Sequence, residues 1–229
     1  MTRNAGVGTA LAEAPFQLDL QLVPAVEFCP ASPAEEFQTL RTRLEQLQSM
    51  RAIRTVLVTS PSPREGKSFT AANLALAEAQ LADNPTLLCD FDLRKPTLHS
   101  LFRIGRGPGI SDHLLGQANL HEALRRIGNS NLFVMPAGEA VINPLGLLHS
   151  KDVRRLMDRL RNTFRRILLD SPPLLLASDA NLLAALSDGT LLVTRIGATT
   201  MDSMTRAIGS LGPDNILGIV ANATGKAGL

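Results

Sequence analysis

The chain has 229 residues, a hydrophobic fraction of 45% and a formal net charge of +2. This length suits one large domain with a buried core, and without a block of Lys and Arg the charge does not indicate nucleic-acid binding. No apolar run reaches the roughly 18 residues that span a bilayer, because Asp170, Asp179 and Asp188 interrupt the most hydrophobic third. We therefore expect neither a membrane span nor a secretory signal, and predict a cytoplasmic protein.

The cysteines of the chain also favour a cytoplasmic location. The chain contains only Cys29 and Cys89, and Cys89 lies inside an apolar run. A buried free thiol is more consistent with that position than a disulfide, which favours a reducing compartment.

The first 33 residues contain four prolines and little periodicity. They predict an extended or disordered segment over residues 1–33. A helix is expected over residues 34–50, because Glu35 and Glu36 suit its positive end and apolar residues then recur at helical spacing. This helix would open a single domain over residues 34–229.

The rest of the chain alternates between strand and helix patterns. Six short apolar or β-branched runs predict strands at 55–59, 86–89, 132–135, 167–169, 190–194 and 216–220. Helical patterns occupy residues 67–81, 152–161 and 201–211. The alternation predicts an α/β fold, with a doubly wound, mainly parallel sheet and helices on both faces. The interval from Pro96 to Asn131 is expected to hold short helices outside the sheet.

Residues 60–68, SPSPREGKS, follow the first predicted strand and match the end of the P-loop pattern GxxxxGK[ST]. In that pattern backbone N–H groups wrap the phosphates of a nucleotide, the lysine reaches the terminal phosphates and the hydroxyl binds Mg²⁺. Pro61 stands where the first glycine would be, and a Gly-Lys-Ser turn alone can simply cap a helix. The predicted nucleotide-binding residues of this loop are Pro63, Arg64, Glu65, Gly66, Lys67, Ser68 and Phe69.

Two further strand ends carry carboxylates. ILLDSPP (167–173) places Asp170 after an apolar run, where it can hold a metal directly or through water. LLCDFDLRK (87–95) places Asp90 and Asp92 on one side of an extended chain. One carboxylate would help bind the metal while another accepts a proton from the incoming nucleophile, although strand-end aspartates that only cap helices are the alternative. The expected Mg-ATP site has Lys67, Asp90, Asp92 and Asp170 as catalytic residues and Ser68, Asp90 and Asp170 as metal ligands.

Several segments, in this order, resemble the bacterial tyrosine kinases of capsule and exopolysaccharide synthesis. They are EEFQTLRTRL, the P-loop with GKS, DFDLRKP, GISDHLLG, FVMPAGEAVINPLGLLHS, and DSPP followed by Ser178 and Asp179. The resemblance implies a P-loop ATPase or kinase domain in which Arg94 orients a phosphate or carboxylate and Asn222 contacts adenine. It also implies a membrane-embedded polysaccharide chain-length determinant as partner, whose cytoplasmic tail recruits the protein to the inner face of the membrane.

Two departures from the family affect the expected function. Its members commonly end in a tyrosine cluster that neighbouring subunits phosphorylate, whereas this sequence contains no tyrosine. Any phosphorylated tyrosine must therefore lie on another chain, in trans. The family's ring interface uses a glutamate and two arginines spaced by three, and here Glu35 and Arg41 match but Gln38 replaces the first arginine. A homo-oligomer is expected to be weakened by that loss of charge.

Three functions therefore stay open. The first is a tyrosine kinase acting in trans, and the second is an ATP-gated assembly or regulatory ATPase without kinase activity. The third is a partition or positioning ATPase, which Ser62 disfavours because those relatives carry a lysine early in the P-loop.

Overall fold

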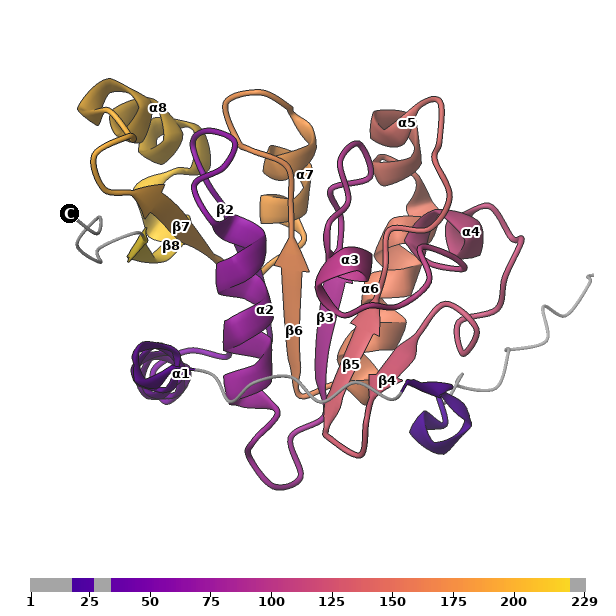
Figure 1. Ribbon diagram of the computed structural model, residues 1–229. Coiled ribbons are helices and arrows are strands. Elements are labelled where there is room, and N and C mark those ends of the chain that lie inside the picture. The colour runs from indigo at the N-terminus through magenta and orange to yellow at the C-terminus, as the bar shows by residue number, and fades with distance from the viewer. Residues whose placement is uncertain (1–17, 27–33, 223–229) are drawn as a thin grey trace, which may run out of the picture.

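The computed structural model describes residues 18–26 and 34–222, in which an eight-stranded sheet forms the middle layer (Figure 1). The strand order is β1-β4-β5-β3-β6-β2-β7-β8, and only the β4–β5 pair is antiparallel. The strands are β1 (Ala25–Val26), β2 (Thr55–Thr59), β3 (Thr86–Asp90), β4 (Arg125–Ile127), β5 (Leu132–Met135), β6 (Arg166–Asp170), β7 (Gly189–Arg195) and β8 (Ile216–Asn222).

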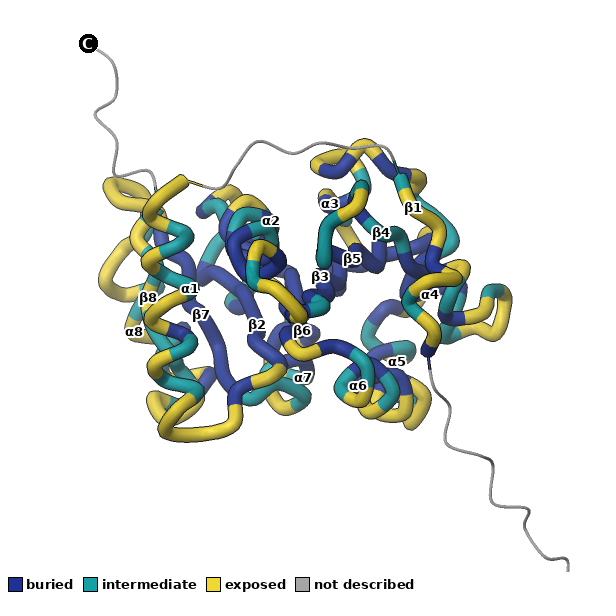
Figure 2. The backbone as a smooth tube through the Cα atoms, turned by 90° about the horizontal axis from the view of Figure 1, so that it is seen from below, coloured by how far each residue is buried: buried dark blue, intermediate teal, exposed yellow. Residues whose placement is uncertain are grey.

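Helices cover both faces of this sheet, which confirms the predicted doubly wound architecture. In Figures 1 and 2, α1, α2 and α3 lie over one face, while α6, α7 and α8 lie over the other. The helices are α1 (Glu35–Gln48), α2 (Lys67–Glu78), α3 (Leu98–Leu101), α4 (Ile110–Leu114), α5 (Pro144–Leu148), α6 (Lys151–Thr163), α7 (Asp179–Ala185) and α8 (Met201–Leu211), with 3-10 turns at η1 (Leu20–Leu22) and η2 (Pro213–Asn215).

The strand sequences explain the two layers of core. Every residue of β2 is buried, and alternate side chains point to opposite faces. Val56 and Val58 belong to the cluster that includes α1 and α2, whereas Leu57 packs in the cluster formed with α6. A strand covered on both faces reads as a continuous apolar run, which is why the sequence signal for these strands was strong.

The structure adds elements that the sequence did not indicate. Short helices α3 and α4 lie in the interval 96–131 as expected, but β4 lies there too and joins the sheet. Within the predicted extended or disordered segment 1–33, the described residues form η1 and the two-residue β1, which pairs with β4. The remainder of that segment lies outside the described residues. Among residues 18–26 and 34–222, no helix combines the length and apolarity needed to cross a bilayer.

Strand order brings the motif-bearing segments together. β6 lies between β3 and β2, and in this register Asp170 is the partner of both Asp90 and Val58. The carboxyl ends of these three parallel strands therefore meet at one edge, where α/β sheets bind their ligands.

Candidate nucleotide site

The P-loop connects β2 to α2, and its glycine is required for two reasons. Gly66 has φ +95°, a left-handed conformation that residues with a Cβ rarely adopt. A Cβ at this position would also lie 1.7 Å from Nδ2 of Asn222. Asn222 donates from that nitrogen to the carbonyl of Glu65 at 3.0 Å, so the end of β8 packs directly against the loop.

Lys67 is the first residue of α2, and its ammonium lies among acidic groups. Nζ is 3.3 Å from Oδ2 of Asp92 and 3.7 Å from Oδ1 of Asp170, and it donates to Oγ of Ser68 at 3.1 Å. Burial alone would lower the pKa of Lys67, but the carboxylates of Asp170 and Asp92 raise it above its ordinary value. The lysine is therefore a permanent cation at the amino end of a helix, a position suited to anions.

Asp170 closes β6 and is fully buried. Neither of its carboxylate oxygens accepts a hydrogen bond from the described part of the chain. Burial raises the pKa of Asp170 to about 6, although the nearby Lys67 opposes this rise. A buried carboxylate without hydrogen bonds is unfavourable unless a further cation or water reaches it.

These residues fit a magnesium ion that is shared with phosphates. Ser68 supplies a hydroxyl beside the lysine, and Asp170 supplies oxygens that accept no hydrogen bond within the described residues, although the Lys67 ammonium lies 3.7 Å from Oδ1. Within the described ranges, no group of three or more His, Cys, Asp or Glu side chains could hold a metal by itself. This is the expected donor set, because Mg²⁺ commonly binds through one or two carboxylates, waters and substrate phosphates.

Asp90 and Asp92 have different surroundings. Oδ2 of Asp90 accepts hydrogen bonds from the backbone N–H groups of Thr97 and Leu98, both at 2.9 Å, at the start of α3. Its Oδ1 accepts from the N–H of Asp92 at 3.3 Å. Burial, together with the Asp170 carboxylate, raises the pKa of Asp90 to about 7. Asp90 thus caps a helix, the alternative stated above, whereas Asp92 faces Lys67.

The prediction that Asp90 and Asp92 share one side of a strand is wrong, because Asp92 lies beyond the end of β3. β3 ends at Asp90, so the chain turns before Asp92 and strand alternation no longer sets its direction. The turn itself sends one carboxylate to the backbone of α3 and the other to the lysine.

Glu65 braces the P-loop through a partner that the sequence did not reveal. Its Oε1 accepts a hydrogen bond from Oγ1 of Thr199 at 2.5 Å, and its Oε2 accepts from the N–H of Ser62 at 2.8 Å. Thr199 lies in the segment between β7 and α8. No local pattern could have indicated it, since the two residues are 134 positions apart.

The other predicted residues of the loop lie toward the surface. Pro63 and Arg64 are exposed at its tip. Phe69 is 52% exposed and makes an edge contact with Phe37 of α1, with ring centroids 5.8 Å apart. Phe69 and Asn222 line the same cavity of about 410 Å³, between α1, the start of α2 and the end of β8. Phe69, a predicted nucleotide-binding residue of the loop, and Asn222, the predicted adenine contact, therefore lie on one cavity.

Arg94 contacts a carboxylate. Its Nε donates to Oδ2 of Asp179 at 2.9 Å, and its Nη2 donates to Oδ1 at 3.4 Å. On α1, the predicted interface residue Arg41 reaches α2, where Nη1 donates to the carbonyl of Ala77 at 3.3 Å. Glu35 is exposed and Gln38 is partly buried.

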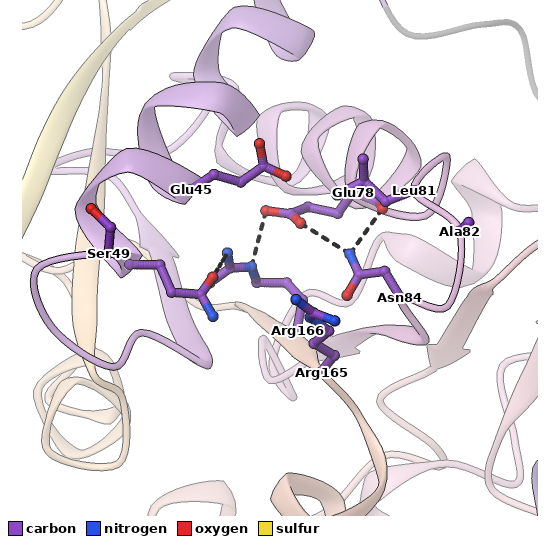
Figure 3. Close-up of a pocket in the computed structure, with 9 residues that line it drawn as sticks. Glu45, Ser49, Glu78, Leu81, Ala82, Asn84, Arg165 and Arg166 are labelled. Atoms are coloured by element: carbon purple, nitrogen blue, oxygen red, sulfur yellow. Dashed lines mark hydrogen bonds and ion pairs between the residues drawn. The ribbon is translucent and has the colours of Figure 1, made fainter.

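A second polar cavity, of about 530 Å³, lies at the amino ends of the strands and is shown in Figure 3. Here Arg166 of β6 donates to Glu78 of α2 at 2.9 Å and to Oε1 of Gln48 at 2.9 Å. Glu78 also accepts from Nδ2 of Asn84 at 3.2 Å. Burial raises the pKa of Glu78, with Arg166 opposing the rise. None of the residues that line this cavity belongs to the predicted nucleotide site, and its buried charges are paired with one another.

The fold and the lysine-bearing loop define a P-loop NTPase. MinD of Pyrococcus horikoshii, solved with Mg-ADP, shares the fold with a TM-score of 0.60 at 20% identity, over 72% of this chain and 67% of that one. No family model matches the chain. The kinase domain of the Escherichia coli tyrosine kinase ETK superposes with a TM-score of 0.80 at 28% identity, over 85% of this chain and 77% of that one.

Sequence comparison identifies the family. Tyrosine-protein kinase YwqD of Bacillus subtilis is 34% identical over 191 residues, which cover 82% of this chain and 80% of the relative. The chain therefore belongs to the bacterial tyrosine-protein kinases of capsule and exopolysaccharide synthesis, and the resemblance drawn from the motifs is confirmed. Other relatives are longer: tyrosine-protein kinase etk of E. coli K12 is 29% identical over 88% of this chain, which spans 28% of that protein.

Proposed function

We propose that this chain is a Mg-ATP-dependent protein tyrosine kinase that phosphorylates other chains and thereby regulates polymerisation and export of an exopolysaccharide or capsule. The observation that carries the proposal is the position of the Lys67 ammonium, 3.3 Å from Asp92 and 3.7 Å from Asp170 at the head of α2. One cation among several buried carboxylates, one of which lacks hydrogen bonds, is an arrangement that a metal-bound triphosphate completes.

In this proposal, Lys67 and the N–H groups of the P-loop neutralise the terminal phosphates of ATP. Ser68 and Asp170 would hold the Mg²⁺ ion, and its charge would offset the negative charge that develops on the transferred phosphate. Asp90 has a structural role in this proposal. Its oxygens accept backbone hydrogen bonds that fix the turn after β3 and the start of α3. Asn222 and Phe69 lie where the adenine would leave the loop.

Asp92 is the proposed proton acceptor. A tyrosine hydroxyl has an ordinary pKa of about 10, so it needs a base as it attacks. The phenol O–H bond breaks toward the carboxylate of Asp92 while oxygen bonds to the γ-phosphorus. The bond from that phosphorus to the bridging oxygen breaks, which leaves phosphotyrosine and ADP.

The proposed acceptor and partner both lie outside this chain. The sequence has no tyrosine, so the acceptor hydroxyl must come from another protein. We further propose that the cytoplasmic tail of a membrane-embedded chain-length determinant recruits the protein to the inner face of the membrane. Self-association through α1 would be weak, because Gln38 is uncharged and Arg41 contacts α2. Nucleic acid has no part in the proposal.

The test is transfer from labelled ATP to a tyrosine-bearing partner, with and without the cytoplasmic tail of a chain-length determinant. Label on phosphotyrosine that requires Mg²⁺ and disappears with Lys67→Ala is the expected result. A matched control is Lys151→Ala, which removes an exposed lysine at the start of α6. Wild-type protein that binds ATP but labels no tyrosine on any such partner would contradict the kinase function.

A second function is favoured by one observation, the absence of tyrosine from the sequence. An ATP-gated assembly or regulatory ATPase would need the same P-loop but no acceptor. Its signature is a partner complex that forms with ATP, is lost in Lys67→Ala and persists in Asp92→Asn. Loss of the complex in Asp92→Asn, together with loss of phosphotyrosine, would instead favour the kinase.

A further inference from the structure

The loop after β3 is tied to α7 by an ion pair that the proposed chemistry does not use. Arg94 approaches Asp179 side-on, with Nε–Oδ2 at 2.9 Å and Nη2–Oδ1 at 3.4 Å. The side chain of Asp179 is only 2% exposed, while that of Arg94 is 48% exposed. A buried carboxylate depends strongly on its cation, so this contact orients both side chains.

Both residues of the ion pair, Arg94 and Asp179, lie in segments that contact the nucleotide site. On the β3 side, Oδ1 of Asp92 accepts from the N–H of Lys95 at 3.0 Å, which forms a tight turn around Arg94. Oδ2 of the same aspartate faces Lys67. The side chain of Arg94 therefore leaves the turn that aims Asp92.

On the other side, Asp179 begins α7 after the segment that follows Asp170. That segment is hydrogen-bonded to the start of the P-loop, from the N–H of Leu174 to the carbonyl of Ser60 at 2.8 Å. Contacts among the P-loop, the β3 turn and the β6–α7 segment thus close a ring. The pair between Arg94 and Asp179 is one of its links.

We propose that Arg94 is a positioning residue that acts through Asp179 to hold Asp92 in line for proton transfer, and that it does not bind phosphate. This inference rests on the proposed kinase function and deepens it. Both carboxylate oxygens of Asp179 accept hydrogen bonds from Arg94. Two of the guanidinium nitrogens of Arg94, Nε and Nη2, therefore already donate to a carboxylate. Freeing the turn would shift Asp92 relative to the acceptor, and small displacements of a catalytic group are costly to rate.

The test compares Arg94→Gln, Asp179→Asn and the double variant with Arg165→Gln, a matched change of an exposed arginine at the opposite end of the sheet. Binding of a fluorescent ATP analogue and kcat for transfer to a tyrosine peptide are measured for each. Either single variant should lower kcat by about 10-fold to 100-fold, with analogue affinity unchanged. The double variant should be no slower than the slower single variant, because both changes break one link. Arg165→Gln should match wild type.

Thermal unfolding and Arg94→Lys separate positioning from simple loss of structure. Lysine keeps the charge and one hydrogen bond, so Arg94→Lys should recover part of kcat at an unchanged melting temperature. An Arg94→Gln variant that weakens analogue binding while Asp179→Asn does not would assign Arg94 to phosphate and overturn the inference. Wild-type kcat in Arg94→Gln would also overturn it, with the kinase function intact. Wild-type protein without any transfer would defeat the kinase function and the inference together.

Discussion

The two ends of β6 each carry a buried charged side chain, and the two differ in whether the protein supplies hydrogen-bond partners for it. At the amino end, Arg166 is matched by Glu78 and Gln48, and the network is complete within the protein. At the carboxyl end, Asp170 has no hydrogen bonds within the described residues and shares Lys67 with Asp92. Complete networks stabilise a fold, whereas incomplete ones cost stability and are retained where a ligand completes them.

Removing the ion pair between Arg166 and Glu78, at the amino end of β6, should cause the largest loss of folding stability. Arg166→Met leaves the Glu78 carboxylate buried without its cation, which typically costs about 3–5 kcal/mol. The melting temperature should fall by roughly 10 °C, while nucleotide affinity of the folded protein stays unchanged. Thermal melts and titration of a fluorescent ATP analogue measure the two quantities. Arg166→Met combined with Glu78→Leu should recover much of the loss, and a double variant as unstable as the single one would contradict this assignment.

Removing the charge of Asp170, at the carboxyl end of β6, should reduce activity without reducing folding stability. Asp170→Asn keeps the shape of the side chain and removes a buried charge that lacks hydrogen bonds. We expect Mg²⁺-dependent transfer to fall by about 100-fold, and the melting temperature of the nucleotide-free protein to rise. A variant that is less stable than wild type near pH 7.5 would show that this end is a structural network like the other.

The same contrast predicts a pH dependence. The pKa of Asp170 rises to about 6 and that of Asp90 to about 7 in the folded protein. The folded state therefore holds protons that the unfolded chain has released, and stability from these groups is lost as pH rises from about 4 to 7. Thermal melts of nucleotide-free wild type and Asp170→Asn should converge near pH 4 and differ most above about pH 7. A difference that is independent of pH would contradict the raised pKa.

The smallest expected effect concerns the brace of the P-loop. Thr199→Val removes the hydroxyl that donates to Glu65 at 2.5 Å while keeping a β-branched side chain. A hydrogen bond to a charged group contributes about 1.5–3 kcal/mol to folding stability. Only the part of that loss that displaces the phosphate-binding loop affects ATP binding, so we expect ATP affinity to fall several-fold. Calorimetric titration of Mg-ATP measures this change. Thr205→Val on exposed helix α8 is the control, and an equal loss there would remove the special role of Thr199.

Several features followed from the sequence alone because they depend on local order. Six strands were predicted from short apolar runs. Five of them (β2, β3, β5, β6 and β7) are buried almost throughout, and a strand covered on both faces must be apolar, whereas the edge strand β8 is only partly buried. Gly66, Lys67 and Ser68 were recognised at the strand-to-helix turn, because their spacing is set by that turn. The family followed from several such segments in a fixed order. The sheet strand β4, with two arginines in three residues, gave no such signal.

Tertiary structure alone decided how the charges divide. Asp90 and Asp92 are equivalent in a sequence pattern, and only the turn after β3 directs one to α3 and the other to Lys67. The partners of Arg94 and Glu65 lie 85 and 134 positions away. Strand order brings them close, and hydrogen bonds form with whatever lies within about 3 Å in space, whatever the distance along the chain.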